Sequence, residues 1–232
     1  LSQRVENEFV GVSCGIMDQY ASACGKRGHA MLLSCDTLAC RYVPLNFTGY
    51  RLILTNTNKK RSLADSKYNE RRAESEAAFA LLHTVYPDKH NLCEITPDEL
   101  SAATHLFQTA PIPFARAQHA VSEQARVHAA AEALVNGRLA RFGRLLHESN
   151  TSLRERYEVT GEHLDALYDA ICKAPGVLGS RMTGAGFGGC NVSLVAADAA
   201  EEFCTVVARG YEKKTGLVPS FYFSEIGAGA HE

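Results

Sequence analysis

The sequence predicts an α+β fold, in which strands and helices are mixed without the regular strand–helix–strand repeat of a parallel sheet. Strand-like segments lie towards both ends of the chain, at residues 29–34, 40–45, 51–56, 191–196 and 220–224. Between residues 64 and 173, apolar side chains recur at helical spacing. A chain of 232 residues with this apolar content is long enough for one large domain or two modest ones.

Two helical segments are expected before the first strand. The opening helix is interrupted near Gly11, and a second helix begins around Gly15. Asp18 then falls in the first turn of that second helix, where a carboxylate meets the positive end of the helix dipole.

The next part of the chain is expected to form strands. Residues 29–34 and 40–45 alternate as the strands of a hairpin or meander do, and 51–56 is a third, more apolar strand. Because a turn at 47–49 precedes this third strand, we place a boundary near residue 50 that divides the chain into domains 1–49 and 50–232.

The helical part of the chain carries recognisable helix ends. Thr96, Pro97 and Glu99 suit the N-cap, N1 and N3 positions at the start of a helix. Asn136-Gly137 is typical of a helix end. Helices are expected at about 66–85, from 97 onwards, and at 113–136, 139–156, 161–173 and 198–215. The helix 113–136 is rich in alanine, and one side of it carries Ala117, Val121, Ala125, Ala129 and Leu134.

Composition excludes several classes of function. A formal net charge of −2 and short, isolated basic clusters argue against nucleic-acid binding, and no apolar run is long enough to cross a membrane. The eight cysteines show no CxxC pair, and no signal peptide precedes them, so we interpret them as reduced thiols of a cytoplasmic protein. No HExxH or GxSxG pattern supports a metallohydrolase or serine hydrolase, and no pattern predicts an oligomeric state.

One glycine-rich stretch, Gly179-Ser180-Arg181-Met182-Thr183-Gly184-Ala185-Gly186-Phe187-Gly188-Gly189-Cys190, stands directly before a strand-like run. Glycine reaches positive φ at little cost and lets other groups approach the main chain, so several together can direct amide groups at an anion such as phosphate. The alternative is a glycine-rich turn that only leads into the strand.

A second stretch, Gly11-Val12-Ser13-Cys14-Gly15-Ile16-Met17-Asp18-Gln19-Tyr20, adds to the first. Together the two resemble the galactokinase branch of the GHMP small-molecule kinases, in which GxxCGIMDQ carries the catalytic aspartate and GSRMTGAGFGGC is the third motif. The resemblance runs through essentially the whole chain and includes residues 55–58, 66–72 and 157–160.

This resemblance implies a GHMP kinase fold, here the end of the N-terminal lobe followed by a ferredoxin-like C-terminal lobe. It implies ATP-dependent phosphorylation of galactose, or of a closely related sugar, at the anomeric hydroxyl. Asp18 would be the catalytic carboxylate, Gly15, Asp18 and Tyr68 would contact the sugar, and Glu6 would hold Mg²⁺. The ATP site would include Gly184, Ala185, Gly186, Gly188 and Gly189.

Each of these residues also has a structural interpretation. Asp18 could simply stabilise the start of its helix, and Tyr68 could be an aromatic side chain that packs on the sheet. Glu6 could be a solvated surface residue, and Glu8 is an alternative metal ligand on the same segment. Arg181 could meet a phosphate or pair with a carboxylate to hold the loop, so it is not assigned to the site.

Two alternatives to a galactokinase remain open. One is a kinase for N-acetylgalactosamine or an arabinose-type sugar, and the other is a galactokinase-like regulator that binds sugar and ATP without needing turnover. The chain also begins without methionine inside a helical pattern, and the family's arginine-containing sugar motif and Ser-rich phosphate loop occur nowhere in it. We therefore expect a missing N-terminal segment, and no activity or tight ATP binding by these 232 residues alone.

Overall fold

A four-stranded antiparallel sheet organises the computed structural model, which describes residues 4–10, 15–59 and 64–230. The strands stand in the order β4-β5-β3-β6. Their bounds are Tyr50–Asn56 for β3, Val177–Thr183 for β4, Cys190–Ala196 for β5 and Ser220–Ser224 for β6. β3 lies at the centre, where it pairs with β5 through Ile53 and Ser193 and with β6 through Ile53 and Phe223.

The connections of this sheet are those of a ferredoxin-like fold. After β3 the chain passes through helices and returns as the hairpin β4–β5, and then passes through one helix and returns as β6. Each pair of neighbouring strands is antiparallel. This split strand–helix–strand arrangement confirms the ferredoxin-like lobe expected from the resemblance.

The helices follow the predicted series closely. Their bounds are Met17–Cys24 for α2, Ala64–His83 for α3, Pro97–Ala102 for α4, Pro111–Val135 for α5, Leu139–Ser152 for α6, Gly161–Ile171 for α7 and Ala200–Thr215 for α8. The π-helical turns are Val5–Val10 and Leu153–Tyr157, and the 3₁₀ turns are Leu92–Glu94, Thr104–Phe107 and Ala197–Ala199. At the start of α4 the predicted cap is present, since Thr96 Oγ1 accepts from the Glu99 amide and Glu99 Oε2 from the Thr96 amide.

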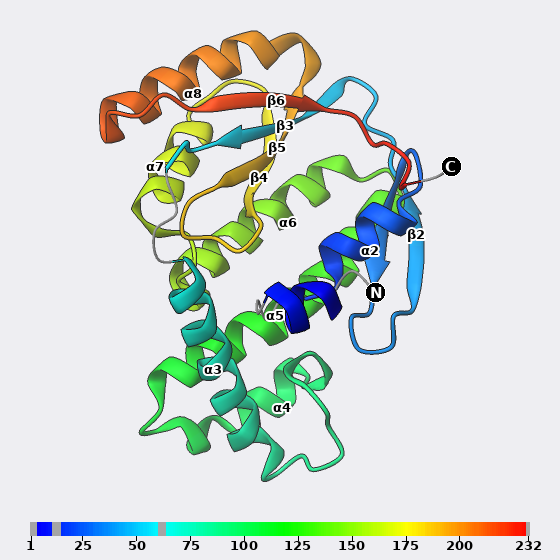
Figure 1. Ribbon diagram of the computed structural model, residues 1–232, viewed down its shortest axis with the longest axis vertical. Coiled ribbons are helices and arrows are strands. Elements are labelled where there is room, and N and C mark those ends of the chain that lie inside the picture. Colours follow the sequence, from blue (N-terminus) through cyan, green and yellow to red (C-terminus); the bar gives the residue numbers. More distant parts are fainter. Residues whose placement is uncertain (1–3, 11–14, 60–63, 231–232) are drawn as a thin grey trace.

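Figure 1 shows the sheet between two layers of helices, with α8 above it and α6 and α5 below it. The main core lies between the sheet and the helices α7 and α8. Ile53 and Val195 from the sheet meet Leu167 of α7 and Phe203 and Val207 of α8 there, all of them fully buried. On the other face, α6 packs along β4.

A second core holds the helices α3, α4 and α5 together below the sheet. It contains Ala78 and Leu82 of α3, Leu100 of α4, and Ala117 and Val121 of α5. The predicted side of α5 is only partly the buried one, because Ala125 is exposed whereas Arg116 and His119 are buried.

A separate two-stranded sheet is formed by β1 (His29–Leu33) and β2 (Cys40–Pro44), as the hairpin prediction requires. It begins after α2, and the phenol of Tyr42 donates to the carbonyl oxygen of Cys24 at the end of that helix (2.6 Å). The chain beyond β6 returns to the same place, where the amides of Gly229 and Ala230 donate to the carbonyl oxygens of Gly25 and Ser22 (2.7 and 2.6 Å). The division into lobes at residue 50 stays a prediction.

Two sequence expectations about elements were wrong. The segment from Gly179 to Thr183 was assigned to the glycine-rich stretch without a strand, but it forms most of strand β4, with Ser180 and Met182 buried on one face. The long helix starts two residues earlier than predicted, at Pro111. Within the described ranges, none of the helices has the length and apolar character that crossing a membrane requires.

Candidate functional site

The glycine loop, residues 184–189, joins β4 to β5. Gly184, Gly186, Gly188 and Gly189 have φ values of 83°, 83°, 115° and 92°, and Phe187 has a φ of 55°. These φ values lie in the left-handed region, which is unfavourable for residues that carry a Cβ atom. The sequence predicts that Gly186 and Gly188 need either a positive φ or a close contact, and the positive φ of both residues confirms this.

Hydrogen bonds hold the glycine loop on both sides. The amide of Phe187 donates to the carbonyl oxygen of Val159 (2.7 Å), and the amide of Gly189 donates to Thr57 Oγ1 (3.2 Å). A Cβ atom on Gly186 would lie only 2.2 Å from the same Val159 oxygen, so this position has no room for a side chain.

The tip of the loop is open. Gly184 and Ala185 are exposed, and within the described part of the chain neither amide donates to a protein acceptor. Exposed, fixed amide groups in a left-handed backbone are suited to bind anionic oxygens. The geometry of the loop tip therefore fits a phosphate group.

Asp18 lies in the first turn of α2, where the sequence predicts it, and its side chain is exposed. Gly15, just before the helix, is also exposed, and a Cβ atom there would meet nothing within 4 Å. Among the described residues, none fills the space beside Gly15 at the start of α2.

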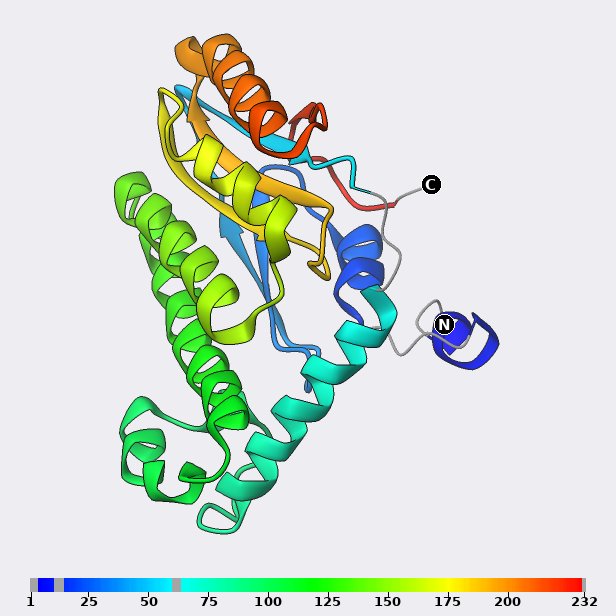
Figure 2. The same ribbon diagram turned by 90° about the vertical axis from the view of Figure 1, so that its left-hand side faces the viewer.

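Tyr68 lies near the start of α3 and is 40% exposed. It lines a cavity of about 640 Å³ between α3 and α5, together with Arg72, His119, Glu123 and Tyr157. The start of α3 also reaches the glycine loop, because Lys67 Nζ lies 5.4 Å from the ring centre of Phe187. In Figure 2, α2 and the start of α3 lie on the same side of the molecule. Figure 1 shows that the two helices are separated from each other on that side.

Glu6 as a metal ligand, with Glu8 as its alternative, stays a prediction. Glu6 lies in the turn Val5–Val10, but its side chain is outside the described part of the structure. Glu8, the alternative, is paired with Arg4 at 3.1 Å. Among residues 4–10, 15–59 and 64–230, no three His, Cys, Asp or Glu side chains gather as a metal site.

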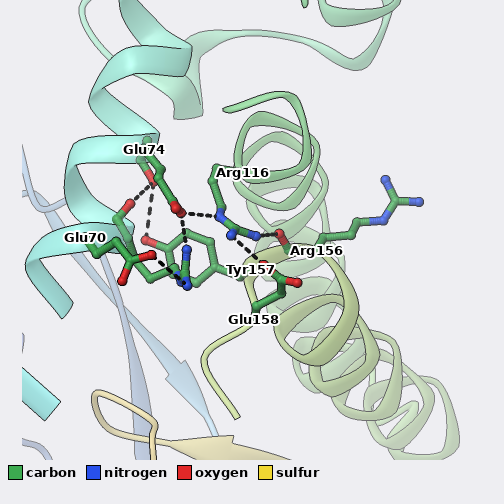
Figure 3. A network of polar contacts seen from close by, with 8 residues as sticks. Glu70, Glu74, Arg116, Arg156, Tyr157 and Glu158 are labelled. Atoms are coloured by element: carbon green, nitrogen blue, oxygen red, sulfur yellow. Dashed lines mark hydrogen bonds and ion pairs between the residues drawn. The ribbon is translucent and has the colours of Figure 1, made fainter. Parts of the chain in front are cut away.

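A buried arginine that the sequence interpretation missed lies behind the loop. Arg116 of α5 is 1% exposed, and it donates to Glu74 Oε2 of α3 (2.7 Å), to Glu158 Oε2 (2.6 Å) and to the carbonyl oxygen of Arg156 (Figure 3). Burial alone would lower the pKa of the Arg116 guanidinium, but the hydrogen bonds to Glu74 and Glu158 outweigh it and raise that pKa. For Glu74 the directions are reversed. Burial alone would raise the pKa of its carboxyl group, but the hydrogen bonds from Arg71 and Arg116 outweigh burial and lower that pKa. Arg116 and Glu74 therefore both stay charged at neutral pH.

A second network connects α5 with β4. Arg181 Nη1 lies 3.3 Å from Glu123 Oε1, so Arg181 has the carboxylate partner that one of its two predicted roles requires. Glu123 also accepts from Arg126 and from the Ser149 hydroxyl, and these contacts lower its pKa although burial would raise it.

His119 lies one turn before Glu123 on the same helix and is buried. Its Nδ1 lies 2.9 Å from Ser152 Oγ, and its ring stacks on Tyr157 with 4.5 Å between the ring centres. Burial lowers the pKa of His119 to about 4, so the imidazole is neutral at pH 7.

Some members of these networks lie in segments that the sequence analysis singled out. Arg181 was considered as the partner of a carboxylate, and Arg71 lies within residues 66–72 of the family resemblance. The segment Tyr157 to Thr160 took part in the family resemblance, but no role followed from it. Helical periodicity could not reveal Arg116, because a buried arginine looks like a surface residue in a pattern of apolar and polar positions.

Comparison with known proteins gives a consistent result. A family model described as "GHMP kinases C terminal" matches residues 130–213. The galactokinase of Halalkalibacterium halodurans is 48% identical over all 232 residues, and that of Bacillus subtilis is 45% identical over the same length. The chain spans 58–59% of the length of these curated relatives.

Solved structures show the same similarity. A crystal structure of Lactococcus lactis galactokinase complexed with galactose matches 98% of this chain and 58% of its own, with a TM-score of 0.93 and 44% identity. The mevalonate kinase of L. major, solved with R-mevalonate, matches 88% of this chain and 50% of its own at 16% identity and a TM-score of 0.50, which shows likeness of fold alone. The structure thus has the GHMP kinase fold that the resemblance implied.

Proposed function

We propose that the chain is part of a GHMP kinase, and that the whole protein transfers the γ-phosphoryl group of ATP to the anomeric hydroxyl of galactose, giving galactose 1-phosphate and ADP. The observation that carries this proposal is the similarity to galactokinases along the full length of the chain, at 44–48% identity. The galactokinase of L. lactis was crystallised with galactose, which supports the choice of sugar.

Asp18 is the proposed catalytic residue. Its exposed carboxylate can accept a hydrogen bond from the anomeric hydroxyl and take its proton, while the sugar oxygen forms a bond to the γ-phosphorus and the bond to ADP breaks. The open space at Gly15 leaves room for the sugar beside this carboxylate. Tyr68 supplies a phenol at the edge of the cavity that can hydrogen-bond a sugar hydroxyl.

The glycine loop is the proposed phosphate contact. The amides of Gly184 and Ala185, which have no protein acceptor among the described residues, are donors for phosphate oxygens. Gly186, Gly188 and Gly189 give the backbone its left-handed path. Because phosphoryl transfer depends on positioning and charge stabilisation, a fixed set of donors contributes directly to the rate.

We also propose that Mg²⁺ accompanies ATP, with Glu6 as a ligand. Magnesium in phosphate sites is held by one or two carboxylates together with waters and phosphate oxygens, so a single glutamate fits this requirement without a larger cluster. When bound, the ion would neutralise charge on the phosphates. A reducing, cytoplasmic location is proposed as well, supported by the thiols of Cys24, Cys35, Cys40, Cys93, Cys172 and Cys204, which form no disulfide within the described residues.

The test is a turnover assay on the complete protein with ATP and Mg²⁺. ADP release would be followed with galactose, N-acetylgalactosamine and arabinose in parallel, and binding of each sugar would be measured by calorimetry. We expect the highest kcat/KM with galactose. Faster turnover of another sugar would replace galactose as substrate, and sugar binding without turnover would indicate a regulator instead of a kinase.

A further inference from the structure

The Arg116 network sits between two parts of the proposed site that are far apart in sequence. Arg116 joins Glu74 of α3 to Glu158, and both carboxylates lie 42 residues away from it along the chain, in opposite directions. Its side chain is 2% exposed, so these partners, together with the Arg156 carbonyl, replace its hydration (Figure 3).

Glu158 and the glycine loop are connected through a single residue. Glu158 has a φ of 55° and ends the π-helical turn Leu153–Tyr157. Val159 follows directly, and its carbonyl oxygen is the acceptor for the Phe187 amide and the atom that Gly186 lies against. The place of the Val159 carbonyl therefore determines where the loop can lie.

Glu158 is held in this conformation by its own turn and by Arg116. Within the turn, the amides of Glu158 and Val159 donate to the carbonyl oxygen of Leu153. A non-glycine residue with φ near 55° is disfavoured, and it persists only where its surroundings hold it. Arg116 adds to that hold twice, through the Glu158 carboxylate and through the carbonyl of Arg156 two residues earlier. Arg116 is itself held by Glu74, which belongs to the helix that carries Tyr68 and Lys67.

We propose that Arg116 is a positioning residue for nucleotide binding: by holding Glu158 in its left-handed conformation, it places the Val159 carbonyl that anchors the glycine loop for the phosphates of ATP. This inference rests on the proposed function for the identity of the ligand. Arg116 itself contacts neither phosphate nor sugar in this scheme and acts only through the loop.

Two variants of the complete protein test the proposal. Glu158→Gln keeps the shape of the side chain but removes its charge, and because Glu158 is 57% exposed the variant is expected to fold. Arg116→Lys keeps a charge but cannot serve three acceptors in the plane of a guanidinium. Glu148→Gln is the control, since it makes the same change in the exposed ion pair Arg141–Glu148 (3.0 Å) on α6.

Two measurements separate positioning from general stability. Hydrogen exchange of the Phe187 amide reports the anchoring bond directly, and steady-state kinetics report the KM for ATP and for galactose. In Glu158→Gln we expect Phe187 exchange to be about tenfold faster, the KM for ATP to rise on the order of fivefold, and the KM for galactose and kcat to stay within about twofold. Arg116→Lys should change the same quantities in the same direction, and Glu148→Gln should change none.

Unchanged Phe187 exchange in Glu158→Gln would overturn the proposal, as would equal rises in the KM values for both substrates. If the wild-type protein does not turn over galactose at all, the proposed function fails, while the exchange of Phe187 still decides whether Arg116 positions the loop.

Discussion

A Cβ atom on Gly179 would lie 2.4 Å from the Cα atom of Gly143, so helix α6 and strand β4 meet backbone against backbone. The reverse test gives the same result, because a Cβ on Gly143 would lie 2.1 Å from the carbonyl oxygen of Leu178. β4 leads directly into the glycine loop, and this contact therefore determines how closely the loop's strand lies on the helix beneath it.

Gly143→Ala should destabilise the protein by about 2–3 kcal/mol, since the added methyl group must push the helix from the strand in a packed interior. Urea unfolding of the complete protein measures this as a lower midpoint at constant m. Gly210→Ala in α8 is the control, because it adds the same methyl group in a helix where the nearest neighbour is the Ala170 Cβ at 3.1 Å. Equal stabilities of the two variants would show that the Gly143 contact relaxes freely.

Gly186→Ala should cost about 3 kcal/mol or more, because it combines a positive φ with a contact of 2.2 Å to the Val159 oxygen. Gly216→Ala has a similar φ of 72° but meets nothing within 4 Å, and should cost only about 1–2 kcal/mol. The difference between the two unfolding free energies isolates the contact from the backbone strain. We also expect Gly186→Ala to weaken ATP binding in calorimetry, and unchanged affinity would argue against a phosphate role for the loop.

Asp18→Asn in the complete protein should lower kcat by a factor on the order of 10² or more and leave the KM for galactose within a few-fold. The reason is that the amide cannot accept the proton of the sugar hydroxyl. Asp98→Asn is a matched control, because Asp98 is also exposed and also lies in the first turn of a helix, α4. A near-normal kcat for Asp18→Asn would leave Asp18 only the structural role that both residues share.

His119 should make stability depend on pH between about 6.5 and 4. Its pKa of about 4 in the folded protein lies below the ordinary value of 6.5, so the unfolded chain binds the proton more tightly and stability falls as pH falls through this window. The loss attributable to His119 reaches about 3 kcal/mol near pH 4. In unfolding curves taken at several pH values, His119→Gln should show a shallower decline than the wild type, whereas His128→Gln, at an exposed position of the same helix, should follow the wild-type slope. Parallel curves for all three proteins would contradict this assignment.

Features that depend on neighbouring residues were predictable from the sequence. The strands of the hairpin β1–β2, the capping box at Thr96 and the end of α5 at Asn136 all follow from local backbone preferences and hydrogen bonds within a few residues. Asp18 in the first turn of α2 and positive φ at Gly186 and Gly188 were predicted in the same way. The family resemblance, not these patterns, supplied their proposed chemistry.

Features that depend on distant segments were decided only by the tertiary structure. Strand β4 was not predicted, because its Gly179 is unusual for a strand. The glycine allows the close approach of α6, and no local sequence pattern indicates that contact. The buried side of α5 carries Arg116 and His119, since Glu74, Glu158 and Ser152 come from other elements to pair with them. A charged side chain belongs in a protein interior only where its partners assemble around it, and that assembly exists only once the chain is folded.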